Sequence, residues 1–89
     1  MGKGDTIEVY FYHAEGCDLC ERMYRELGAF SAGPGSAFSL EIISRDVEDN
    51  PEWARLYREL LPVLVVNDEE VCHYFFDSEA LMRTLSVSG

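Results

Sequence analysis

Apolar and polar residues alternate along two stretches of the chain. Residues 6–12 place Ile7, Val9 and Phe11 between more polar neighbours, and residues 38–44 repeat the alternation. Successive side chains of a strand point to opposite faces of a sheet, so this two-residue period is typical of half-buried strands. Two strands are predicted here.

A period of three to four residues replaces the alternation at Cys17. The apolar positions that follow share one face of a helix, while charged residues occupy the other face. Glycines and a proline at residues 33–36 are typical of a helix end. We therefore predict a helix from Cys17 that stops before residue 33 and buries Leu19, Met23, Leu27 and Phe30.

Two further helices are predicted from their caps. Asn50 before Pro51 indicates a helix start, because the asparagine side chain accepts a backbone N–H and proline fits the first helical position. Asp77 is predicted to cap a final helix in the same way. The helix after Asn50 is expected to run to about Leu60 and to bury Trp53, Leu56, Tyr57 and Leu60. The final helix is expected to carry Ala80, Leu81 and Leu85.

Residues 62–66 form a continuous apolar run, which is typical of a strand covered on both faces. Asn67 and Asp68 are turn formers, and residues 71–76 are expected to pair back as a hairpin. The predicted order is β-α-β-α-β-β-α, in which a crossover helix makes the first two strands parallel. The expected fold is α/β, a four-stranded mixed sheet with helices on both faces.

Length and charge limit what the chain can be. Its 89 residues are expected to form one domain, residues 1–89. The formal net charge of −10 repels phosphate backbones and anionic lipid surfaces, so no nucleic-acid or membrane partner is expected. No apolar run approaches the roughly 20 residues that a membrane helix needs.

Three cysteines are the next informative feature. An odd number in a short chain argues against a secreted disulfide framework. No apolar leader precedes the first predicted strand, so a cytoplasmic location is expected. The close pair Cys17 and Cys20 is then available for redox or metal chemistry.

The position of this pair at a helix start favours redox chemistry. Unpaired backbone N–H groups and the helix dipole stabilise a thiolate at Cys17, and such settings lower a cysteine pKa from near 8.5 to about 3.5–7.5. Cys17 is the expected nucleophile. Cys20, one turn later, is placed to attack a mixed disulfide on Cys17 and release the product.

Charged neighbours are expected to tune the pKa of Cys17. Asp18 adjoins the sulfur and, together with Glu15 and Glu21, disfavours the thiolate. His13 is a candidate source of positive charge that would favour the thiolate instead. We expect the helix dipole to prevail over the carboxylates.

A metal-binding or iron–sulfur-carrying module is the alternative function. One CxxC can be half of a zinc site, and Cys72 and His73 offer further ligands. Neighbours on a strand point to opposite faces, so these two are poorly placed to hold one ion, and the sequence has no second CxxC. We predict no metal site and expect Cys72 to be buried, with a regulatory thiol as its alternative role.

The order of these motifs resembles the glutaredoxin-like branch of the thioredoxin superfamily, over about residues 6–85. The resemblance implies thiol–disulfide exchange, with Cys17 as the attacking and Cys20 as the resolving thiol. It also implies a cis Leu61–Pro62 bond facing them, and a Leu61 backbone that pairs with an extended substrate. The opening is similar to that of small bacterial glutaredoxin-like proteins, matched here by Tyr12, His13, Gly16, Cys17, Leu19, Cys20 and Glu21.

The sequence departs from true glutaredoxins within the site. Asp18-Leu19 stands between the cysteines in place of Pro-Tyr, and Cys72-His73 replaces the glycine pair that lets glutathione approach the backbone. Leu60-Leu61 replaces Thr-Val before the proline, which favours protein partners. We expect a monomer with no resident cofactor that acts on a disulfide-containing protein or a small thiol, with glutathione binding left open.

Overall fold

The computed structural model describes residues 6–88 and has the predicted order of elements. Its four strands form one sheet in the order β2-β1-β3-β4, with β1 parallel to β2 and β3 antiparallel to both β1 and β4. The strands are β1 (Thr6–His13), β2 (Ser39–Asp46), β3 (Val63–Val66) and β4 (Glu69–His73). The helices are α1 (Asp18–Ala32), α2 (Pro51–Tyr57) and α3 (Ser78–Ser88), with 3-10 helices at Val47–Asp49 and Arg58–Leu60.

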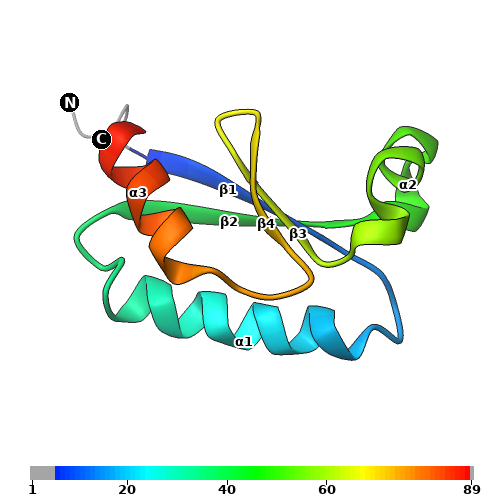
Figure 1. Ribbon diagram of the computed structural model, residues 1–89, viewed down its shortest axis with the longest axis horizontal. Helices are drawn as coiled ribbons and strands as arrows, with labels where there is room; N and C mark the ends of the chain where they lie inside the picture. Colours follow the sequence, from blue (N-terminus) through cyan, green and yellow to red (C-terminus); the bar gives the residue numbers. More distant parts are fainter. Residues whose placement is uncertain (1–5, 89) are drawn as a thin grey trace.

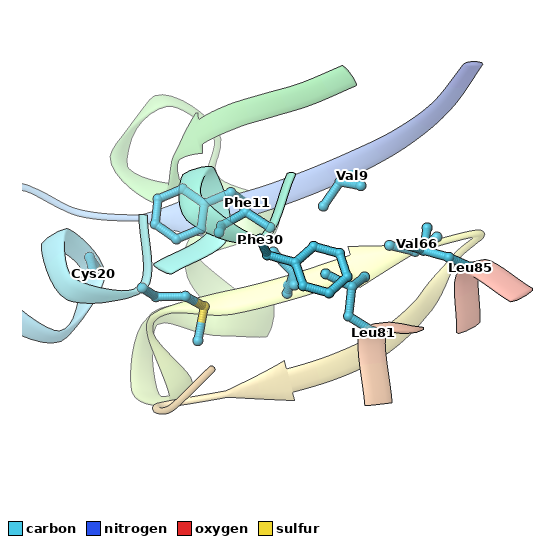
Figure 2. Close-up of a cluster of buried hydrophobic side chains, with 10 residues drawn as sticks. Val9, Phe11, Cys20, Phe30, Val66, Leu81 and Leu85 are labelled. Atoms are coloured by element: carbon cyan, nitrogen blue, oxygen red, sulfur yellow. The ribbon is translucent and has the colours of Figure 1, made fainter. Parts of the chain in front are cut away.

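Helices cover both faces of the sheet, as predicted (Figure 1). Phe11 of β1 joins Leu27 of α1 and Leu85 of α3 in the larger core, which Figure 2 shows with Cys20 at one end and Leu85 at the other. Tyr12, the next residue of β1, faces the opposite way and packs with α2. The alternation read from the sequence therefore divides β1 between two cores. No helix within residues 6–88 is long and apolar enough to cross a membrane.

The predicted caps are present at both later helices. The Asn50 side chain accepts the backbone N–H of Glu52 at 2.9 Å, and Pro51 takes the first position of α2. The Asp77 side chain accepts the N–H of Ala80 at 3.0 Å in the first turn of α3. These contacts satisfy helix N–H groups that would otherwise lack a partner.

The predicted buried stripe of α2 is wrong at Leu56, which is 47% exposed. The helix packs on the sheet through Trp53, Ala54 and Tyr57. Each helical residue turns by about 100°, so Leu56 lies about 100° from Tyr57 on the side away from Ala54. The α-helix also ends at Tyr57 and reaches residue 60 only as a 3-10 turn.

The final hairpin begins and ends earlier than predicted. Asn67 and Asp68 make a tight turn with φ of 54° and 64°, which matches the twist of paired strands. Strand β4 then ends at His73 rather than at residue 76. Tyr74 takes a φ of 66°, and its N–H donates to the carbonyl of Pro62 at 2.9 Å. This contact ties the end of β4 to the start of β3.

Arg45 of β2 connects α2 to the sheet. Its guanidinium carbon lies 4.3 Å from the centre of the Tyr10 ring and 4.7 Å from that of Trp53. Its Nη1 donates to the hydroxyl of Tyr12 at 3.0 Å. A cation between aromatic faces is attracted by the ring quadrupoles, so Arg45 stabilises this side of the molecule through both contacts.

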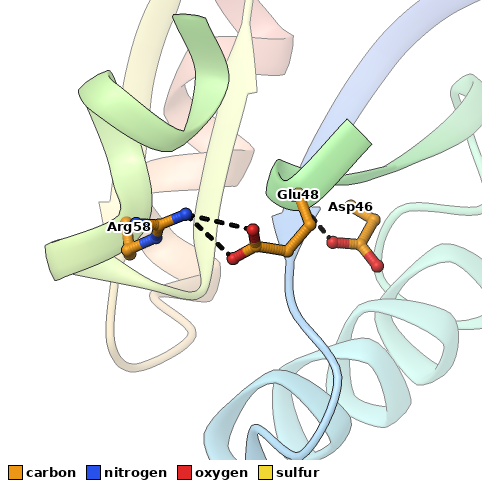
Figure 3. Close-up of polar contacts among 3 residues, drawn as sticks. All are labelled: Asp46, Glu48 and Arg58. Carbon is orange, nitrogen blue, oxygen red and sulfur yellow. Dashed lines mark hydrogen bonds and ion pairs between the residues drawn. The ribbon is translucent and has the colours of Figure 1, made fainter. Parts of the chain in front are cut away.

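A short polar chain holds the segment between β2 and β3 (Figure 3). Arg58 Nη2 lies 3.0 Å from each carboxylate oxygen of Glu48, and Asp46 accepts the backbone N–H of Glu48 at 2.9 Å. Both side chains of the ion pair are more than half exposed, so the pair contributes about 1 kcal/mol or less. The pair joins the two 3-10 helices, one before α2 and one after it.

Candidate functional site

The candidate site lies where β1 gives way to α1. Gly16 turns the chain there with a φ of 74°, a conformation that glycine adopts without steric cost. Cys17 is the N-cap of α1, and its Sγ accepts the backbone N–H of Cys20 at 3.1 Å. The first sulfur therefore meets a helix N–H group, which is the setting predicted from the sequence.

The structure joins Cys17 and Cys20 as a disulfide, with their Cα atoms 5.2 Å apart. Cys17 is half-buried, whereas Cys20 is 3% exposed and lies at one end of the larger core (Figure 2). Solvent therefore reaches the first sulfur more readily than the second.

Leu61 and Pro62 lie at the same end of the sheet as the cysteines. Their peptide bond is cis, as the resemblance implied. Val63 pairs with Tyr12, so the start of β3 lies beside the end of β1, from which the chain leads into Cys17. Leu61 and Cys17 also pack against the same core cluster.

The two residues predicted to tune the pKa of Cys17 are also near this end. His13 closes β1, and its ring stacks on Phe11 with centroids 5.5 Å apart. Asp18 is exposed and is the first residue of α1. Glu15 and Glu21 are exposed as well, so three exposed carboxylates lie within four residues of half-buried Cys17 in the chain.

A groove beside the cysteine pair does not follow from the sequence pattern. Tyr24 is 52% exposed, although its ring contacts Phe11 with centroids 5.5 Å apart. It lies four residues after Cys20, one turn along the same helix face, and that spacing is the signal that could have indicated the groove. We call this the Tyr24 groove; its walls include Phe11, His13, Glu15, Cys20, Glu21 and Tyr24.

Cys72 lies on β4, opposite Leu64 of β3. It is half-buried rather than fully buried, although it packs against the larger core. Burial raises the pKa of the Cys72 thiol, and the backbone N–H of Asp77 partly offsets this effect. His73, next along the strand, pairs with Glu70. Within residues 6–88, no group of three or more His, Cys, Asp or Glu side chains is placed to hold a metal ion.

With the Cys17–Cys20 disulfide closed, we expect iodoacetamide to modify Cys72 alone, and slowly at pH 7. The raised pKa keeps this thiol protonated at neutral pH, so its rate should climb only as the pH rises past the range of an ordinary cysteine. Peptide mass spectrometry over a pH series measures this, with a cysteine peptide as the reference. Faster labelling than the peptide at pH 7 would contradict the assignment.

The sheet order, the helices on both faces and a CxxC at the start of α1 together define an α/β protein of the thioredoxin fold. Within that class, the chain belongs to the family described as Glutaredoxin-like domain (DUF836), whose model matches residues 8–86. The resemblance to glutaredoxin-like proteins noted in the sequence is therefore confirmed. Among curated proteins, none matches the chain.

Solved structures agree with this assignment. Protein Ne2328 from Nitrosomonas europaea is 31% identical, with a TM-score of 0.74, and the match covers 88% of this chain and 89% of that one. Chloroplastic thioredoxin z is 20% identical with a TM-score of 0.66, covering 99% and 84%. Oxidised mitochondrial thioredoxin 3 from Saccharomyces cerevisiae is 18% identical with a TM-score of 0.62, covering 91% and 77%. Family, fold and the cysteine pair support a redox thiol function.

Proposed function

We propose that the protein is a thiol–disulfide oxidoreductase that reduces protein disulfides through Cys17 and Cys20. One observation carries the proposal. The Cys17 sulfur caps α1 and accepts a helix N–H, while Cys20 is almost fully buried one turn further on. The helix N-terminus favours a thiolate on the accessible sulfur, and burial keeps the second sulfur from reacting first with the substrate.

In the first step, the Cys17 thiolate attacks one sulfur of the substrate disulfide. A bond forms between Cys17 and that sulfur, the substrate S–S bond breaks, and the departing thiolate takes a proton from solvent. The product is a mixed disulfide on Cys17. Leu61, with an extended backbone at φ −60° and ψ 142°, is the proposed pairing site for the substrate chain beside Pro62.

In the second step, Cys20 loses its proton to solvent and attacks the Cys17 sulfur. The mixed disulfide breaks and the second substrate sulfur leaves as a thiolate. Two electrons have then passed from the cysteine pair to the substrate, and the pair is oxidised to the disulfide seen in the structure. An external thiol reductant restores the dithiol by the reverse exchange.

The test is a single-turnover reduction of a peptide disulfide by the pre-reduced protein. We expect one peptide disulfide to be reduced for each chain, with Cys17 and Cys20 oxidised in step, because the pair supplies two electrons. Quantitative mass spectrometry follows both partners. Cys17→Ser should remove the reaction, and Cys72→Ser, the matched control, should keep it. Reaction by the Cys17 variant, or loss in the Cys72 variant, would sink the proposal.

Asp18 is the proposed source of charge tuning. Asp18→Asn should lower the pKa of Cys17 by about 0.1–0.7 pH units, because an exposed carboxylate beside the sulfur disfavours the thiolate only weakly. The variant's disulfide should also be easier to reduce, since a better thiolate stabilises the reduced state. Thiolate absorbance titrations at two salt concentrations measure the shift, with Glu41→Gln on β2 as a control. A rise in the pKa would contradict the argument.

A further inference from the structure

We propose that the Tyr24 groove selects protein disulfides that have a lysine or arginine next to the reacting cysteine. The inference rests on the proposed function and names its substrate class. It follows from three observations: an open groove beside the cysteine pair, aromatic rings along its wall, and carboxylates on its rim.

The groove is positioned to hold a residue that flanks the reacting sulfur. Gly16, the residue before Cys17, and Cys20, one helical turn after it, both line the groove. A substrate sulfur joined to Cys17 therefore brings its neighbouring residues to the groove. The rings of His13 and Tyr24 both contact Phe11, at 5.5 Å between centroids, and form an aromatic surface there.

The charge around the groove favours a cation. Glu15, Asp18 and Glu21 are exposed and form no ion pair within the described part of the chain, residues 6–88. Glu15, Glu21 and Arg25 line the groove, so its charged side chains sum to 1 − 2 = −1, and Asp18 adds a further negative charge beside Cys17. The sign agrees with the net charge of −10 for the whole chain.

A lysine or arginine side chain complements both features. Aromatic faces attract cations, and long basic side chains cover apolar surface with their methylene stems while the charge meets a carboxylate. Asp18 adjoins Cys17, and Glu21 lies one turn along α1, with its N–H bonded to the Cys17 carbonyl at 3.2 Å. Charges are screened over about 8 Å at physiological salt, so carboxylates on residues this close in the chain to Cys17 can act on a cation held beside it.

The experiment compares three peptide disulfides that differ only in the residue beside the cysteine: lysine, glutamine or glutamate. Pre-reduced protein is mixed with each, and the second-order rate is followed by stopped flow at low and high salt. We expect the lysine peptide to react roughly 2–30 times faster than the glutamine peptide, the range that two surface ion pairs supply, and the glutamate peptide to react slowest. High salt should reduce the differences among the three rates, because it screens the charges.

Variants of the protein distinguish an effect of the groove carboxylates from an effect of the overall negative charge. Glu15→Gln together with Glu21→Gln should remove most of the lysine preference. Glu41→Gln makes a similar exposed change on β2 beside Glu8, about 16 Å along the sheet from His13, and should keep the preference. Tyr24→Leu keeps an apolar wall without the ring and should lower the lysine rate more than the glutamine rate.

The glutamine peptide keeps the two proposals distinguishable. If none of the three peptides is reduced, the oxidoreductase proposal itself fails. If the glutamine peptide is reduced but the three rates agree, or if Glu41→Gln reduces the preference as much as the double variant does, the groove has no selective role and only the present inference is overturned.

Discussion

The Cys20→Ser protein is expected to accumulate a mixed disulfide on Cys17 in near-stoichiometric yield when it meets a peptide disulfide. The first step needs only the accessible sulfur at the helix cap, and the buried thiol that would release the product has been removed. Cys17→Ser should capture almost none, because Cys20 is 3% exposed. Non-reducing mass spectrometry with peptide mapping measures both yields.

Cys72 must be excluded as the trapping site in this experiment. Both variants are therefore made in a Cys72→Ser background, which leaves a single thiol in each protein. Equal capture rates for the two single-thiol proteins would show that the roles of attacking and resolving thiol are wrongly assigned. Capture by the Cys17→Ser protein alone would reverse them.

Leu27→Ala is expected to give the largest loss of stability, about 3–5 kcal/mol in the free energy of unfolding. Leu27 is 0% exposed on α1, and truncation leaves a cavity among side chains that close only partly around it. Leu56→Ala makes the same chemical change on α2, where the side chain is 47% exposed, and should cost less than about 1 kcal/mol. Urea unfolding of both variants under the same redox conditions gives the comparison.

A similar loss in the two leucine variants would contradict the packing of the two helices. The slope of the free energy against urea must stay constant for the comparison to hold, because a changed slope reports a change in the denatured or native ensemble. Far-ultraviolet circular dichroism of the folded variants checks that the helices are retained.

Local chemistry explains how much of the fold was predictable. Asn50 and Asp77 can satisfy helix N–H groups from a single side chain, so their sequence positions predict two helix starts correctly. The predicted burial of Leu56 was wrong because burial depends on which side of a short helix meets the sheet. Ala54, and not Leu56, lies on that side of α2. The end of β4 was predicted too late in the chain because the strand stops where the N–H of Tyr74 donates to the carbonyl of Pro62. Pro62 lies twelve positions earlier in the chain, so this contact is not visible in the local sequence.

Some features of the candidate site could likewise be predicted from the sequence, and others could not. The helix cap at Cys17 follows from a strand-to-helix change in period, which is visible in the sequence. The cis bond at Pro62 was expected from family resemblance alone, since most bonds before proline are trans. The Tyr24 groove required the structure, because Phe11, Glu15 and Tyr24 come from three successive segments of the chain.

The placement of Trp53 gives the molecule an internal optical reporter. It is the single tryptophan of the chain, and its ring lies against Arg45 and the edge of Tyr12 on the α2 side of the sheet. Cys20 belongs to the core on the opposite side. Tryptophan emission therefore follows the detachment of α2 from the sheet, whereas thiol chemistry reports on the other layer, so the loosening of the two layers can be timed separately in one unlabelled protein.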